Sequence, residues 1–169
     1  MKVLCVASGG SLSDFNASLY YGCYDVVIAV NCAWQAAPWC DVIYAGDFKW
    51  WEAYHSEIYT DCVRVCANED ARIFGCEHHK TDTSFNSGAN AIRYAVKLGA
   101  KEIDLIGYDC SLKNGSHFHG DHKRIDNPKA ESIALWQWQF KVVADECEKL
   151  GVKVLNRSAY TELECFDRV

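Results

Sequence analysis

The fold of this chain is decided by the stretch SGANAIRYAVKLGAKEIDLIGYD, residues 87 to 109. An apolar stripe at helical spacing predicts a helix from Ser87 to Leu98, and Gly99 is typical of a helix end. Residues 102–106 are mostly apolar and predict a strand that stops at a glycine. A helix that leads directly into an apolar strand is the repeating unit of a parallel sheet. This stretch therefore predicts an α/β protein.

The rest of the chain repeats this alternation. Further strands are predicted at 3–7, 25–30, 42–45, 62–66, 72–76 and 152–155, and further helices at 48–58 and 129–150. The run Asp-Val-Val-Ile-Ala-Val at 25–30 is apolar on both faces, as expected of a buried parallel strand. With two prolines, no repeat and no linker, nothing marks a domain boundary. We predict a single Rossmann-like α/β domain over residues 1–169, with a mostly parallel sheet and helices on both faces.

Composition and charge indicate which kinds of binding partner to expect. Half of the residues are apolar, 24% are charged, and the formal net charge is −6. An acidic chain is not expected to bind a nucleic-acid backbone or an anionic membrane. No apolar run approaches the roughly 18 residues of a transmembrane helix, and Met1 to Val6 is predicted to be a strand rather than a signal peptide. These features predict a cytoplasmic protein with a small-molecule ligand, and a homo-oligomer is compatible with them.

The sequence contains ten cysteines, a number that suggests disulfides in a small secreted protein. Most of them lie within or beside apolar segments and no secretory signal is present, so we interpret them as buried, reduced thiols. A structural zinc site formed by Cys62, Cys66 and Cys76 with His78 and His79 is the alternative.

Polar residues follow the predicted strands, where ligands bind in open parallel sheets. Gly9 and Gly10 would let backbone N–H groups approach a phosphate, although an ordinary turn also explains them. Asn86 to Gly88 opens a helix and predicts either an anion site or a plain N-cap. Asp47 and Asp109 follow separate strands and could converge on a ribose or on Mg²⁺. The predicted ligand-binding residues are Ser8, Gly9, Gly10, Ser11, Asn31, Asp47, Ser87, Gly88 and Asp109.

The segment His117-Phe-His-Gly-Asp-His122 has the H-x-H-x-D-H pattern of the metallo-β-lactamase superfamily. A polar turn precedes it and no histidine follows it, so the further ligands of that family are missing. Three roles remain open for this histidine loop. One imidazole, from His117, His119 or His122, could act as a general base. The loop could bind a divalent cation, Mg²⁺ or Zn²⁺, through His117, His119, Asp121 and His122. It could also be a purely structural loop.

The block from 87 to 109 resembles a segment of two enzyme families. Its Ser-Gly, Leu-Gly, Lys-Glu-Ile and Gly-Tyr-Asp elements resemble the S-G, A-L-G, K-E-I and G-x-D elements of bacterial family 42 sialyltransferases. The block is also similar to the related domain of archaeal-type 6-hydroxymethylpterin diphosphokinases. The first loop, Ser-Gly-Gly-Ser-Leu at 8–12, resembles their G-x-G-P-S-L loop, and Asn31 stands where the sialyltransferases place an asparagine.

A second resemblance covers nearly the whole chain and is to a group of short phage-encoded proteins. The shared segments are Ala-Pro-Trp-x-Asp-Val at 37–42, Asn-Ser-Gly at 86–88, the histidine loop at 117–122 and Leu-x-Cys-Phe at 163–166. Membership of this group implies a location in the cytoplasm of a bacterial host.

Together the resemblances imply a nucleotide site. They place the first loop, Asn31, Ser87, Gly88 and Asp109 around a phosphate, base or ribose, and they imply a catalytic base from the histidine loop, His119 or His122 first. We predict a transferase that binds a nucleotide or nucleotide-sugar, for glycosyl or diphospho transfer. Two alternatives stay open: a non-catalytic phage protein that sequesters a nucleotide, and a metal-dependent hydrolase that uses the histidine loop.

Overall fold

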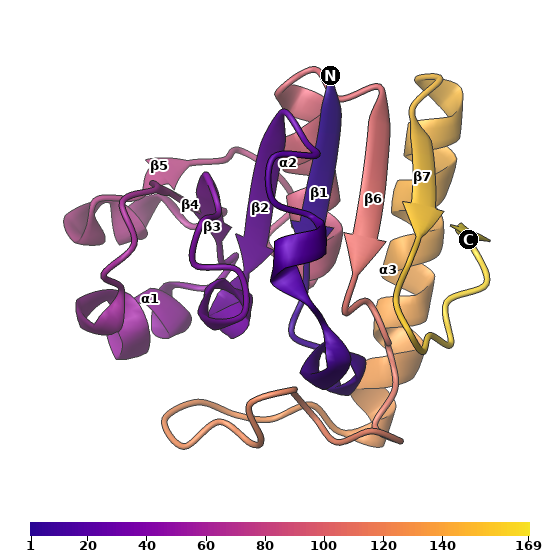
Figure 1. Ribbon diagram of the computed structural model, residues 1–169. Coiled ribbons are helices and arrows are strands. Elements are labelled where there is room, and N and C mark those ends of the chain that lie inside the picture. The colour runs from indigo at the N-terminus through magenta and orange to yellow at the C-terminus, as the bar shows by residue number, and fades with distance from the viewer.

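Eight parallel strands form one sheet in the computed structural model, which describes residues 1–169 (Figure 1). The strands are β1 (Lys2–Val6), β2 (Val26–Val30), β3 (Val42–Tyr44), β4 (Val63–Cys66), β5 (Glu77–His78), β6 (Glu102–Ile106), β7 (Lys153–Asn156) and β8 (Asp167–Arg168). Their order is β5-β4-β3-β2-β1-β6-β7-β8. The chain builds outward from β1 to β5 and then returns to place β6 on the other side of β1. Because the direction of strand addition reverses there, the space between β1 and β6 is the topological switch point of the sheet.

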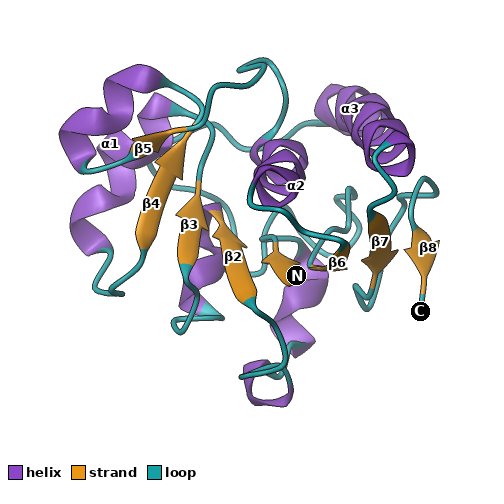
Figure 2. Cartoon of the chain, turned by 90° about the horizontal axis from the view of Figure 1, so that it is seen from above, coloured by secondary structure: helices purple, strands orange, loops and turns teal.

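Helices cover both faces of the sheet, as the sequence predicts. The helices α2 (Ser87–Lys97) and α3 (Ala130–Lys149) lie side by side on one face (Figure 2). They close a core that contains Ile92, Phe140 and Val143. The short helix α1 (Phe48–Tyr54) and a set of 3₁₀ turns lie on the other face, over a second core. None of these helices combines the length and the apolar character that crossing a bilayer requires.

The second face is covered with little regular helix. The crossovers from β1 to β2 and from β2 to β3 contain only 3₁₀ turns, at Gly10–Asp14, Ala17–Leu19 and Asn31–Gln35. Large aromatic side chains fill this layer: Trp34, Trp50 and Trp51 are each at most 4% exposed. The indole N–H of Trp51 donates to the carbonyl of Ala45 at 2.9 Å, which satisfies its polar atom inside the core. Indole rings thus supply the apolar volume that a crossover helix usually provides.

The predicted strand at 72–76 is wrong. Residues Glu69–Phe74 form a 3₁₀ helix, and the strand β5 follows it. The side chain of Asn68 accepts a hydrogen bond from the N–H of Asp70 at 2.9 Å and so starts the turn. Gly75 ends it with a left-handed φ of 79°. The short strand β8 also had no counterpart among the predicted elements.

All ten cysteines are free thiols, and six of them are buried. The alternative zinc site at Cys62, Cys66 and Cys76 does not assemble, since these sulfur atoms do not come together with His78 or His79 at ligand distances. Burial raises the pKa of the Cys66 thiol to about 11 and that of Cys76 to about 12. Both therefore remain protonated and serve as small apolar side chains.

Candidate functional site

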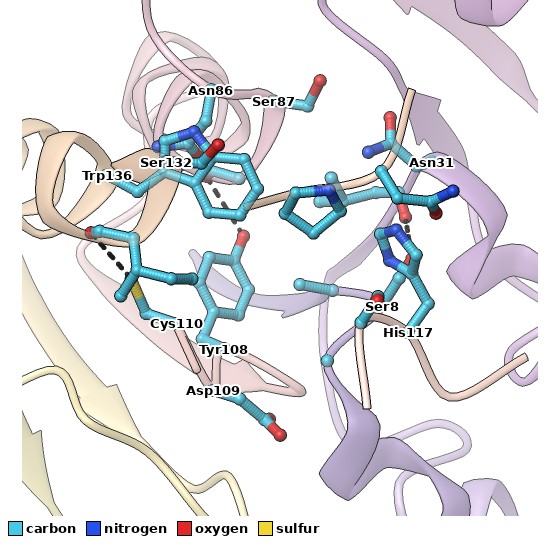
Figure 3. Close-up of a pocket in the computed structure, with 18 of the residues that line it drawn as sticks. Ser8, Asn31, Asn86, Ser87, Tyr108, Asp109, Cys110, His117, Ser132 and Trp136 are labelled. Carbon is cyan, nitrogen blue, oxygen red and sulfur yellow. Dashed lines mark hydrogen bonds between the residues drawn. The ribbon is translucent and has the colours of Figure 1, made fainter. Parts of the chain in front are cut away.

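A cavity of about 370 Å³ opens at the carboxyl ends of β1, β2, β3 and β6, at the switch point of the sheet. This volume lies within the range of small-molecule sites. The first turns of α2 and α3 form one wall, and the histidine loop forms another (Figure 3). Nine of the predicted site residues line it: Ser8, Gly9, Asn31, Asp47, Ser87, Gly88, Asp109, His117 and His122. Four others, Gly10, Ser11, His119 and Asp121, do not.

In the first loop the N–H groups of Gly9 and Ser11 bind partners inside the protein. The N–H of Gly9 donates to the carbonyl of Gly107 at 2.9 Å, and the N–H of Ser11 donates to the carboxylate of Asp109 at 2.8 Å. A Cβ on Gly9 would stand 2.4 Å from the Gly107 oxygen, and one on Gly10 would stand 2.0 Å from the oxygen of Asn114. The glycines are needed because backbone packs on backbone here. The prediction that they cradle a phosphate is not supported by this geometry.

Asp109, which follows β6, is joined to the first loop by hydrogen bonds. Its side chain is 2% exposed, and its two oxygens accept hydrogen bonds from the N–H and the hydroxyl of Ser11. Burial raises the pKa of Asp109, while the bonds from Ser11 act in the opposite direction. Its carboxylate points away from the other labelled residues of the cavity (Figure 3). The predicted pairing of Asp109 with Asp47 around a ribose or Mg²⁺ therefore finds no support, and Asp47 lies exposed at the cavity mouth.

The first turn of α2 presents unpaired N–H groups to the cavity. Asn86 caps the helix, and its side-chain oxygen accepts from the N–H of Ala89 at 2.9 Å. The hydroxyl of Ser87 accepts from the N–H of Gly46 at 2.9 Å. The backbone N–H groups of Ser87 and Gly88 have no partner within the protein, and both residues line the cavity. A helix N-terminus with free N–H groups favours a bound anion.

Gly88 also has a packing reason to be glycine. A Cβ there would lie 3.2 Å from ring atoms of Phe140 and Tyr108, tighter than ordinary van der Waals contact. The hydroxyl of Tyr108 donates to the carbonyl of Gly88 at 3.2 Å. The aromatic wall of the cavity thus sits directly against the anion-binding turn.

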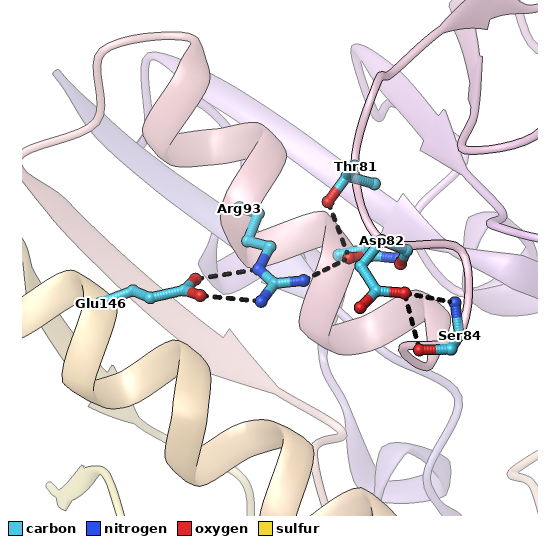
Figure 4. A network of polar contacts seen from close by, with 6 residues as sticks. Thr81, Asp82, Ser84, Arg93 and Glu146 are labelled. Carbon is cyan, nitrogen blue, oxygen red and sulfur yellow. Dashed lines mark hydrogen bonds and ion pairs between the residues drawn. The ribbon is translucent and has the colours of Figure 1, made fainter.

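Side chains of α3 hold the start of α2 in place. The side-chain oxygen of Gln139 accepts from both the N–H and the amide nitrogen of Asn86, each at 2.9 Å. Its own amide nitrogen donates to the carbonyl of Ser84 at 2.9 Å. Arg93 forms a two-pronged ion pair with Glu146, at 2.9 and 2.8 Å (Figure 4). Gln139 is not among the predicted site residues, although a glutamine inside the apolar stripe of a long helix is a signal of a buried polar contact.

The three imidazoles of the histidine loop form a cluster. The ring centre of His122 is 4.3 Å from that of His117 and 4.9 Å from that of His119. Burial lowers the pKa of His117 and of His122 to about 4, and it lowers the pKa of His119 as well. The Nε2 atoms of His117 and His119 are buried and have no hydrogen-bond partner. These rings are therefore neutral near pH 7, and the lone pairs on two of their nitrogens are free of partners within the protein.

Asp121 does not join this cluster. Its carboxylate accepts a hydrogen bond from the hydroxyl of Ser116 at 2.6 Å, on the exposed side of the loop. Asn127 holds the backbone of His122, accepting from its N–H at 2.7 Å and donating to its carbonyl at 3.0 Å. The predicted ligand set of His117, His119, Asp121 and His122 is therefore not brought together at ligand distances.

The cavity lining contains no lysine and no arginine. Three carboxylates, those of Asp47, Asp109 and Asp126, belong to it. The positive potential for an anion therefore comes from the first turn of α2, which is equivalent to roughly half an elementary charge. Such a site suits a ligand with one phosphate better than a diphosphate or triphosphate.

Comparisons of this chain with protein-family models, with curated proteins and with solved structures found no match.

Proposed function

We propose that this protein binds a nucleotide or nucleotide-sugar with a single phosphate at the first turn of α2 and transfers its glycosyl group. The observation that carries the proposal is the pair of free N–H groups, of Ser87 and Gly88, facing a cavity at the switch point of a parallel sheet. Ligand phosphates bind helix N-termini in this position because the N–H groups and the helix dipole both favour an anion.

The remaining walls suit a base and a sugar. Trp136 and Tyr108 offer aromatic surface on which a base can stack. Asn31 at the end of β2 has a left-handed φ of 51°, an uncommon conformation for a residue other than glycine. Backbone strain of this kind concentrates at binding sites. The amide of Asn31 lines the cavity and provides a donor and an acceptor for a base edge or a ribose hydroxyl.

His117 is the residue we assign as the general base. It lines the cavity, and its Nε2 has no partner within the protein. In the proposed step Nε2 accepts the proton of an acceptor hydroxyl, whose oxygen forms a bond to the anomeric carbon. The bond from that carbon to the phosphate oxygen breaks, and the phosphate keeps the electron pair. The N–H groups of Ser87 and Gly88 stabilise the charge that develops on this leaving group.

Isothermal titration with CMP, UMP, AMP and GMP, with the matching nucleosides and diphosphates, tests the binding proposal. We expect a monophosphate to bind about tenfold more tightly than its nucleoside, since an anion at a helix N-terminus contributes about 1–2 kcal/mol. Absence of binding by every mononucleotide at millimolar concentration would refute the proposal.

A matched pair of variants isolates the backbone N–H. Ser87→Pro removes the N–H at the first helical position, where proline is well tolerated. Asn86 precedes it with an extended backbone, φ −61° and ψ 157°, which is compatible with a following proline. Ser87→Ala removes the hydroxyl and keeps the N–H. The proposal predicts weaker monophosphate binding by Ser87→Pro than by Ser87→Ala, and equal binding by the two variants contradicts it.

The transferase step is tested with CMP-sugars, with UDP- and GDP-sugars as diphosphate comparisons and release of the free nucleotide as the readout. His117→Gln should retain nucleotide binding and lose this release. A ligand that binds and is recovered unchanged after incubation with a range of hydroxyl acceptors contradicts the catalytic step and leaves the binding proposal standing.

A further inference from the structure

One cysteine and two histidines form a group of metal-binding side chains beside the cavity. The H-x-H-x-D-H motif does not include the cysteine. The sulfur of Cys32 lies with one ring nitrogen each of His119 and His122 so that the three atoms are within 4.8 Å of one another. Cys32 belongs to the 3₁₀ turn after β2, whereas the histidines belong to the loop between β6 and α3. The fold therefore brings together a thiol and two imidazoles from distant parts of the chain.

The ligand atoms of this set are kept free of other partners. The Nε2 of His119 is buried and has no hydrogen-bond partner, which is costly for a polar atom unless something binds it. The Nδ1 of His122 lies 3.0 Å from the hydroxyl of Tyr54. With Nδ1–H donating to that hydroxyl, the Nε2 lone pair is left for a ligand, the usual arrangement behind a metal-binding histidine. The side chain of Cys32 is 2% exposed and is not part of a disulfide.

We propose that Cys32, His119 and His122 bind one Zn²⁺ ion. One thiolate and two imidazoles are a ligand set that zinc prefers and magnesium does not. A tetrahedral zinc ion holds such ligand atoms about 3.5 Å apart, so a small closure of the loop completes the geometry. Cys32 binds as the thiolate and releases its proton to solvent.

The three proposed ligands leave the fourth coordination position of a tetrahedral zinc ion without a protein ligand. Three protein ligands with a free fourth position are typical of catalytic rather than structural zinc. His122 lines the cavity, and so does His117 next to it. An ion bound here would lie beside the part of the cavity wall that His122 forms, and it would add positive charge next to a lining that has no lysine or arginine.

Cobalt substitution tests the ligand set directly, because Co²⁺ accepts the tetrahedral geometry of zinc and reports a thiolate ligand by a charge-transfer absorption. We expect this band to saturate at one Co²⁺ ion per chain, with Zn²⁺ displacing the cobalt. Cys32→Ser should lose the band, and His119→Ala should bind metal more than about tenfold more weakly. His119 lies in a loop outside both cores, so this variant remains informative if Cys32→Ser does not fold.

Two controls separate this site from the alternatives. Cys147→Ser changes a cysteine with the same 2% exposure elsewhere in the core and should keep the band. Asp121→Asn changes the carboxylate of the H-x-H-x-D-H motif and should also keep it. The inference is overturned if wild-type protein develops no band with excess Co²⁺, if the band persists in Cys32→Ser, or if Asp121→Asn abolishes it.

These measurements use protein without nucleotide, so their outcome does not depend on the proposed function. Titration of chelator-treated protein with mononucleotides tests that function separately.

Discussion

The buried imidazole of His79 makes the stability of this fold depend on pH by an amount that follows from its surroundings. His79 is 4% exposed. Its Nδ1 lies 2.8 Å from the hydroxyl of Tyr44, and the rings of Tyr44 and Tyr94 pack against it edge to face. Burial, and to a smaller extent the nearby Lys97, His78 and Arg93, lower the pKa of His79 from 6.5 to about 4.

The sign of the effect follows from this depressed pKa. In the unfolded chain His79 takes up a proton near pH 6.5, whereas in the folded protein it stays neutral down to about pH 4. The unfolded state therefore binds more protons in this window, and the free energy of unfolding falls as the pH is lowered through it. Each pKa unit corresponds to about 1.4 kcal/mol. A fall in pKa from 6.5 to about 4 is thus worth about 3 kcal/mol of stability, present at neutral pH and lost at about pH 4.

Urea unfolding of wild type and of His79→Gln, both with chelator present, measures this contribution. Glutamine can still accept a hydrogen bond from Tyr44, and it does not titrate. Between about pH 7.5 and about pH 4, wild type should lose about 3 kcal/mol more than the variant. The constant cost of the substitution cancels in this comparison. Parallel pH profiles for the two proteins would show that His79 does not contribute to the loss of stability at low pH.

Three further predictions concern groups that hold the site and the sheet. Asp104 is fully buried, pairs with the partly exposed Arg157 at 2.8 Å and accepts a hydrogen bond from the hydroxyl of Tyr24 at 2.6 Å; Asp104→Ala removes this acceptor and should lower the free energy of unfolding by about 1–3 kcal/mol, measured in urea. Gly9→Ala places a methyl group 2.4 Å from the Gly107 carbonyl and should lower the thermal midpoint, with a cost of about 1–3 kcal/mol. Gln139→Leu leaves the polar groups at the start of α2 unpaired; it should cost about 1–3 kcal/mol and weaken mononucleotide binding in the same titration. If one of these variants is as stable as wild type, the contact described for that residue does not contribute to stability.

The sequence predicts the general position of the cavity because the carboxyl ends of parallel strands meet at one edge of a sheet. Asn31, Ser87 and Gly88 are found there for this reason. The sequence does not show what a side chain or a glycine packs against. Gly10 is therefore predicted to bind phosphate, although its space is occupied by the backbone of Asn114.

The sequence also does not predict Cys32 as a ligand of the proposed zinc site, because it does not show which residues distant in the chain are neighbours in space. The H-x-H-x-D-H pattern groups residues that are neighbours in the chain, and so it includes Asp121, which turns toward Ser116. Cys32 enters the cluster only because β2 and β6 both lie beside β1 in the sheet. Periodicity predicts the strands, but their order in the sheet is needed to bring this sulfur to the histidines.

The use of indole rings in place of crossover helices concentrates the packing of one face of the sheet in three residues. On the α2 and α3 face the buried core contains no tryptophan, and aliphatic side chains share its volume with the smaller rings of phenylalanine and tyrosine. On the opposite face Trp34, Trp50 and Trp51 are buried, and each fills a volume that would otherwise need several smaller side chains. Replacing a buried tryptophan by alanine typically costs about 3–5 kcal/mol, a large part of the stability of a small domain. We therefore expect substitution to be strongly restricted at these three positions.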